Sequence, residues 1–107
     1  MAVGDVRQGT FIRTQANGRT TIASLIGGTT YLLLKIKPGG VILVGDATID
    51  PAGGDTAKGY RLTPGEEFYI DDGGNTAANL IDGSKINIFA VEGARPVSIS
   101  IFAIDDV

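Results

Sequence analysis

The sequence contains no cysteine, no histidine and no tryptophan, and its single methionine is the first residue. Without cysteine there is no disulfide framework, thiolate nucleophile or zinc cluster. Without histidine the chain lacks the side chain most used for proton transfer and transition-metal binding near neutral pH. These absences disfavour catalysis, so we expect a protein that is not an enzyme and that uses no cofactor.

Long apolar runs are also missing. The most apolar stretch, residues 30–44, is interrupted by Lys35, Lys37 and Pro38, and it is shorter than the ~20 residues that a membrane-spanning helix needs. Residues 1–10 contain no apolar signal-peptide core. We therefore expect synthesis in the cytoplasm and no membrane partner. The formal net charge of −3 and the lack of a basic, aromatic-rich stripe argue against nucleic-acid binding.

Glycine, in contrast, is abundant, with 16 residues in a chain of 107. Several glycines occur as pairs, at 27–28, 39–40, 53–54 and 73–74. Glycine adopts positive φ without steric cost, which tight turns require. Paired glycines between short apolar segments therefore indicate a succession of strands and turns.

The apolar residues alternate along the chain and show no helical period. In the C-terminal segment, Ser98 and Ser100 alternate with apolar residues, as in a strand buried on one face. Leu32, Leu34 and Ile36 are expected on one face of a second strand, with Tyr31, Leu33, Lys35 and Lys37 on the other. Residues 41–44 are apolar throughout and suit a strand covered on both faces. We expect strands near residues 6–14, 19–26, 29–37, 41–45, 47–50, 58–62, 66–71, 78–82, 85–91 and 96–104.

The fold expected from this pattern is all-β, with residues 1–107 forming a single-domain β-sandwich (jelly-roll-like) or a small β-barrel. Asn17-Gly18 predicts a hairpin between the first two strands, and Pro64-Gly65 predicts a type II-like turn. Residues 1–24 hold three arginines against one aspartate, a net charge of +2, which leaves −5 for the remainder of a chain of net charge −3. This segment is either a strap that lies on an acidic neighbour or a solvated edge hairpin.

The acidic residues are the remaining candidates for metal ligands and catalytic groups. Asp71, Asp72 and Asn75 are the best calcium candidates, but they lack the ligand spacing of a calcium loop. Aspartates beside glycine more often bind the backbone of their own turn, so we expect no metal. Glu66 and Glu67 are adjacent in a predicted strand and point to opposite faces, so they cannot act together on one glycosidic bond.

Residues 40–104 resemble a pattern found in small tailed-bacteriophage virion proteins. An apolar strand at Val41–Gly45 is followed by the segment G-Y-R-L-T-P-G-E at Gly59–Glu66, which leads into F-Y-I-D at Phe68–Asp71. The sequence K-I-N-I-F-A at Lys85–Ala90 then precedes the alternating strand V-S-I-S-I at Val97–Ile101, and we expect these two to form a closing hairpin. The resemblance covers turns and alternation, and residues 1–39 match no part of it.

The resemblance implies a virion structural role, and we expect a head decoration (cement) protein. Such a protein lies on the capsid surface of the virion, commonly as a homotrimer, and clamps neighbouring subunits of the major capsid protein. Two alternatives stay open: a phage tail, neck or head-fibre component, and a carbohydrate-binding β-sandwich in which Tyr60 or Tyr69 stacks on sugars. The candidate residues for contacts with capsid or sister subunits are Arg7, Phe11, Arg13, Arg19, Tyr60 and Tyr69.

Overall fold

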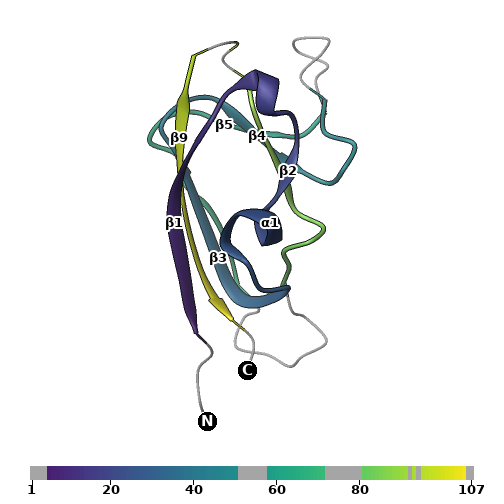
Figure 1. Ribbon diagram of the computed structural model, residues 1–107, viewed down its shortest axis with the longest axis vertical. Coiled ribbons are helices and arrows are strands. Elements are labelled where there is room, and N and C mark those ends of the chain that lie inside the picture. The colour runs from purple at the N-terminus through teal and green to yellow at the C-terminus, as the bar shows by residue number, and fades with distance from the viewer. Residues whose placement is uncertain (1–4, 51–57, 72–80, 92, 94, 106–107) are drawn as a thin grey trace.

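The computed structural model describes residues 5–50, 58–71, 81–91, 93 and 95–105. Two antiparallel sheets face each other, with one short helix at their margin (Figure 1). In chain order the elements are β1 (Val6–Arg13), η1 (Gln15–Asn17), β2 (Thr20–Thr21), α1 (Ile22–Ile26), β3 (Thr30–Pro38), β4 (Ile42–Gly45), β5 (Tyr60–Leu62), β6 (Phe68–Asp71), β7 (Ile81–Asp82), β8 (Asn87–Ala90) and β9 (Val97–Asp105). The predicted all-β fold is confirmed, and of the two architectures considered the sandwich is the one formed.

The larger sheet has the strand order β1-β9-β3-β6, and β7 also pairs with β3. The smaller sheet has the order β2-β8-β4-β5. Successive strands β8 and β9 therefore belong to different sheets, and the chain crosses between the layers after β8. The expected closing hairpin of these two strands is wrong, because each finds its partners in its own sheet.

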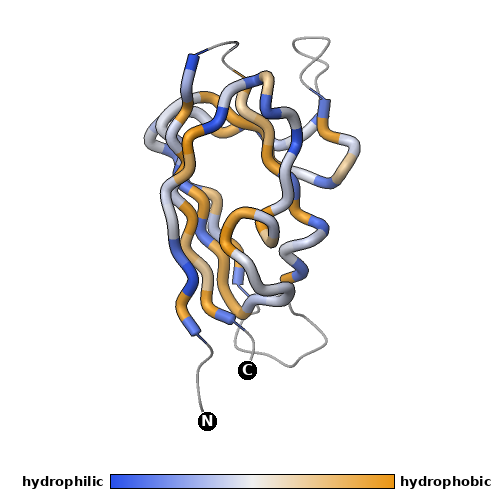
Figure 2. Tube along the Cα trace, in the orientation of Figure 1, coloured by the Kyte–Doolittle hydropathy of each residue, from blue (hydrophilic) through white to orange (hydrophobic). Residues whose placement is uncertain are grey.

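The core lies between the inner faces of the two sheets. In β9 the residues Val97, Ile99, Ile101 and Ala103 are buried, whereas the serines between them are exposed. The tube coloured by hydropathy shows the same alternation along the strands of the larger sheet (Figure 2). In β4 Leu43 is buried as well, on the face opposite Ile42 and Val44, which confirms a strand covered on both sides.

The segment after β1 does not return as a hairpin. β1 pairs with β9 along its whole length, and β2 pairs with β8 in the other sheet. The hairpin predicted at Asn17-Gly18 is therefore wrong, since the chain uses this turn to cross between the sheets. The strand expected at residues 19–26 is also largely wrong, because helix α1 begins directly after Thr21.

Local capping explains this helix. The side chain of Thr21 accepts a hydrogen bond from the backbone N–H of Ser24 at 3.2 Å, as an N-cap residue does. Gly27, with a φ of 79°, ends the helix, and its N–H donates to the carbonyl of Ala23. The apolar residues of 22–26 then contribute to the core from a single helical turn and a half, without an alternating strand.

A register shift in β3 changes the direction of one aromatic side chain. β3 pairs regularly with β9 from Leu33 onward, but the register shifts between Tyr31 and Leu33, as at a β-bulge. The extra residue turns Tyr31 into the core, where it is fully buried. The expectation that Tyr31 shares the outward face with Leu33 is therefore wrong, whereas Leu34 and Ile36 lie inward as expected.

The chain turns at Pro64-Gly65, as predicted, and also at residues 47–50, where a strand was predicted. The turn predicted at Pro64-Gly65 is confirmed: Glu66 N–H donates to the carbonyl of Thr63 at 3.1 Å, and Gly65 has a φ of 91°. The strand expected at residues 47–50 is instead a turn that ends in a single bridge between Asp50 and Lys58.

Of the strand expected at 78–82, residues 78–80 lie outside the described part, and β7 occupies the rest.

Three carboxylates cap turns through the backbone N–H and the hydroxyl of a nearby Ser or Thr. Glu66 accepts both hydrogen bonds from Thr63, at 2.7 and 2.6 Å. Asp46 accepts from Thr48, and Asp82 accepts from Ser84 in the same way. In each case the side-chain hydrogen bond, followed by the backbone one, lowers the pKa of the carboxyl below its ordinary value.

These caps predict a loss of stability in acid. Because the folded pKa values lie below the unfolded ones, the stabilisation is complete above about pH 4.5 and is lost as pH falls through the folded values. We expect the melting temperature to drop between pH 7 and pH 3, and the drop to shrink in the triple variant E66Q/D46N/D82N. Thermal melts at several pH values test this, with Glu67→Gln as the control; an equal drop in the triple variant would contradict it.

Candidate interaction surface

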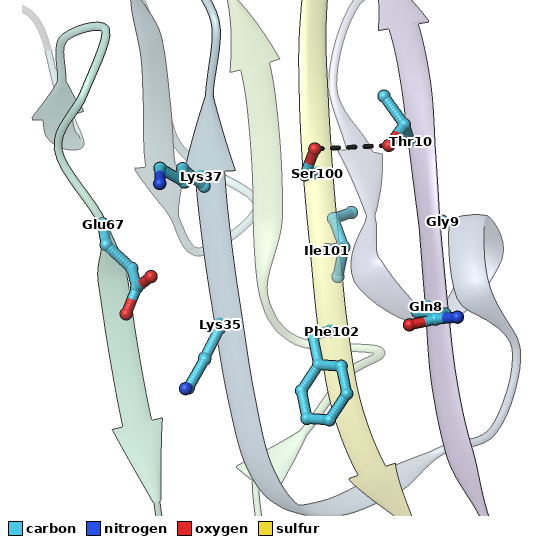
Figure 3. A pocket seen from close by; sticks show the side chains of 9 residues that line it. All are labelled: Gln8, Gly9, Thr10, Lys35, Lys37, Glu67, Ser100, Ile101 and Phe102. Carbon is cyan, nitrogen blue, oxygen red and sulfur yellow. Dashed lines mark hydrogen bonds between the residues drawn. The ribbon is translucent and has the colours of Figure 1, made fainter.

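The outer face of the larger sheet carries a shallow hollow of about 490 Å³. It forms where β1, β9, β3 and the start of β6 lie next to one another (Figure 3). The residues that line it are Gln8, Gly9, Thr10, Lys35, Lys37, Glu67, Ser100, Ile101 and Phe102. Strand register groups the side chains of Gln8, Thr10, Lys35, Lys37, Ser100 and Phe102, because cross-strand neighbours share a face of the sheet. Gln8 is level with Phe102 and Lys35, and Thr10 is level with Ser100 and Lys37.

The side chains in the hollow are mostly polar and keep hydrogen-bonding capacity. The hydroxyls of Thr10 and Ser100 lie 3.2 Å apart and share one hydrogen bond, drawn in Figure 3. The ammonium group of Lys35 lies 5.4 Å from the ring centre of its cross-strand neighbour Tyr69. Phe102 contributes an aromatic ring beside the two lysines. With Lys35 and Lys37 against Glu67, the hollow carries a net charge of +1 and is partly apolar, on a chain of negative net charge.

Exposed apolar side chains flank the hollow. On β1, Val6 is 56 % exposed and Ile12 is 63 % exposed. On β6, at the opposite edge of the sheet, Tyr69 is 50 % exposed. Protein-binding surfaces combine exposed apolar side chains with polar groups, and here the polar hollow lies between the apolar side chains of β1 and β6. This arrangement suits contact with another protein.

Two of the predicted contact residues have roles inside the fold. Arg7 lies at the margin of the sandwich, where its Nε donates to both carboxylate oxygens of Asp105, at 2.7 and 2.8 Å. Its Nη1 donates to the carbonyl of Ile26 at 3.3 Å. The pKa of Arg7 is raised, chiefly by the hydrogen bond to Asp105. Phe11 is half-buried and packs against the core.

The other two predicted arginines lie nearer the surface. Arg13 Nη2 donates to the carbonyl of Asn17 at 3.4 Å, next to its own strand. Arg19 is exposed, and its Nη1 donates to the carbonyl of Ile49 at 3.1 Å. The structure does not gather Arg7, Arg13 and Arg19 into one basic patch, because the chain passes from the larger sheet to the smaller one between Arg13 and Arg19.

The two tyrosines considered for sugar stacking lie in different sheets. Tyr60 is on β5 of the smaller sheet and is 62 % exposed. Tyr69 is on β6 of the larger sheet, where its hydroxyl donates to Asp71 at 2.7 Å. This hydrogen bond is the main cause of the raised pKa of Tyr69. The two rings therefore do not form a shared stacking platform.

Of the calcium candidates, only Asp71 is described, and its carboxylate is bound by Tyr69. Asp72 and Asn75 lie outside the described residues. In the parts of the chain that the structure places, no three acidic side chains come together in a manner that could hold a metal ion.

Sequence reasoning missed the residues that line the hollow, although it noted some of them. Lys35 and Lys37 were expected on the same face of their strand, and Ser100 on the exposed side of its strand, which the structure confirms. The missing information was that β9 lies between β1 and β3, because alternation gives the face of each residue but not its neighbouring strand.

The comparisons with known proteins add no relative. No protein-family model, no curated protein and no solved structure matches this chain significantly. No helix in the described portion is long and apolar enough to cross a membrane. The candidate surface is therefore defined by its geometry alone.

Proposed function

We propose that this protein is a bacteriophage head decoration (cement) protein that binds the outer capsid surface and stabilises contacts between major capsid subunits. The observation that carries the proposal is the outer face of the larger sheet. It combines exposed apolar side chains with the lysine-bearing hollow, and no described element covers it. A face of this kind supports binding to a large protein partner.

Two further features support the same role. The segments that resemble phage virion proteins supply β4, β5, β8 and β9. Of these strands, β4, β8 and β9 lie inside their sheets and β5 lies at an edge. Binding to a repetitive shell also needs no catalytic group, because modest contacts repeated over many sites add up to a large total stabilisation. The capsid-surface location implied by the resemblance belongs to this proposal.

Co-sedimentation tests the proposal directly. The purified protein is mixed with mature capsids of the phage that encodes it, and it is expected to pellet with them and raise their melting temperature. No binding at about micromolar concentration would overturn the proposed function. Quantified virion gels provide a second criterion: a copy number of only a few dozen per particle would place the protein in the tail, neck or a head fibre instead.

Charge reversal tests whether the hollow is the contact. The variant K35E/K37E is expected to weaken capsid binding by at least about tenfold, since it replaces two cations with two anions at an interface. Lys85→Glu, at an exposed turn outside the hollow, serves as the matched control and should bind as the parent does. Equal binding of all three proteins would show that the contact lies elsewhere on the surface.

A further inference from the structure

The outer edge of β1 carries no paired strand among the described residues. β1 is the end strand of the larger sheet, and among the described strands it pairs only with β9. Asp105 N–H donates to the carbonyl of Asp5 at 2.9 Å, which sets the alternation of the ladder. Odd-numbered residues of β1 exchange hydrogen bonds with β9, and even-numbered residues direct their N–H and C=O groups to the open side. Such an edge can accept another strand.

The usual protections of an edge strand are weak in β1. The strand contains neither lysine nor proline, and its pairing with β9 runs from Val6 to Arg13 without a register shift. An inward-pointing charge can also block an added strand. The inward charge of Arg7 is already neutralised by Asp105.

We propose that β1 pairs with β1 of a second copy of this chain, antiparallel and centred on Gly9, so that two larger sheets join into one. In this register Val6 faces Ile12 of the partner subunit, and these are the two exposed apolar residues of the strand. Gln8 faces the partner's Thr10. Asp5 faces the partner's Arg13, an opposite-charge pair that the symmetry forms twice.

Neighbouring registers lack this complementarity. Centring the pair on Thr10 places Arg7 opposite the partner's Arg13 and Gln8 opposite the partner's Ile12. Centring it on Gln8 places Val6 opposite the partner's Thr10 and leaves Ile12 beyond the paired residues. A shift by one residue places outward side chains opposite inward ones, which a sheet does not allow.

Glycine at the centre suits the twofold axis. There the two copies of Gly9 form a non-hydrogen-bonded pair, in which Cα atoms approach to about 4.5 Å. A Cβ on Gly9 would lie 2.7 Å from the Phe11 ring, so that ring already occupies the position of the missing side chain. The strand therefore presents no side chain at its centre. The pairing would also bring the two hollows to the same face, because each is lined by Gln8 and Thr10.

This proposal does not depend on capsid binding, and its test needs only the purified chain. Light scattering is expected to give twice the monomer mass of 11.1 kDa at high protein concentration. Thr10→Pro is expected to give the monomer, because proline removes an N–H that faces the open edge and leaves the backbone hydrogen bonds to β9 intact. Thr10→Val keeps that N–H and should remain dimeric. Circular dichroism confirms that both variants fold.

A charge swap tests the register. Arg13→Glu or Asp5→Arg alone places like charges opposite each other twice, and each is expected to weaken the dimer about tenfold. The double variant D5R/R13E restores opposite charges and is expected to recover the parental affinity. A monomer at all concentrations, a trimer insensitive to Thr10→Pro, or a double variant no tighter than the singles would each overturn the proposal.

Discussion

Replacement of Tyr31 by alanine is expected to lower the free energy of unfolding by about 3–5 kcal/mol, the cost of removing a buried aromatic side chain. Tyr31, the second residue of β3, is fully buried. Its hydroxyl donates to the carbonyl of Gly27 at 2.5 Å, beyond the end of α1. The ring thus joins the sheet to the helix terminus. The total free energy of unfolding of a small domain is only about 5–15 kcal/mol. Urea denaturation should therefore show a large shift of the midpoint to lower urea concentration.

Two further variants separate the ring from the hydroxyl and test its packing. Tyr31→Phe removes only the hydrogen bond and is expected to cost about 1 kcal/mol. Gly83→Ala places a Cβ against the Tyr31 ring and is expected to cost about 1–3 kcal/mol by overpacking. Tyr31→Leu should relieve that clash, so the double variant G83A/Y31L should cost less than the sum of its parts. Simple additivity would show that Gly83 does not press on the ring.

The position of Tyr31 shows how far alternation in the sequence predicts the fold. Alternation correctly separated Leu34 and Ile36 from Lys35 and Lys37, because a regular strand places every second residue on one face. It failed at Tyr31, because the bulge in β3 adds one residue and reverses the side-chain direction. A bulge depends on the partner strand, and the sequence of β3 alone carries no mark of it.

Connections between strands were harder to predict than strands. Asn17-Gly18 has the composition of a hairpin turn, yet β1 pairs with β9, eighty or more residues away in the chain. Turn chemistry describes a local bend and does not say which sheet the next strand joins. The same limit affected the candidate surface, since Thr10 and Ser100 become neighbours only through this long-range pairing. The exposed side was predictable for β9 and for most of β3, but the grouping of their residues into one hollow was not.

A second, smaller core lies on the outer face of the smaller sheet, and truncating its central side chain is expected to lower the free energy of unfolding strongly. Ile49 is 2 % exposed and Leu43 is 1 % exposed, although neither faces the space between the sheets. The Cγ2 atom of Ile49 lies over Gly45 and Gly59, where a Cβ would come within 2.5 and 3.1 Å of it. Arg19 holds the segment in place through the carbonyl of Ile49. The turn after β4 therefore folds back and covers its own strand.

Ile49→Ala is expected to lower the free energy of unfolding by about 2–4 kcal/mol, because it removes a buried isoleucine and leaves a cavity. Gly45 and Gly59 beneath it have no side chains that could fill this cavity. Ile12→Ala is the matched control: Ile12 is 63 % exposed, and in dilute solution its truncation should change stability by about 0.5 kcal/mol or less. Urea denaturation measures both variants. Hydrogen exchange at Leu43 should also quicken in Ile49→Ala, since the covering turn then opens more readily. Equal stabilities of the two variants would contradict a packed core at this face.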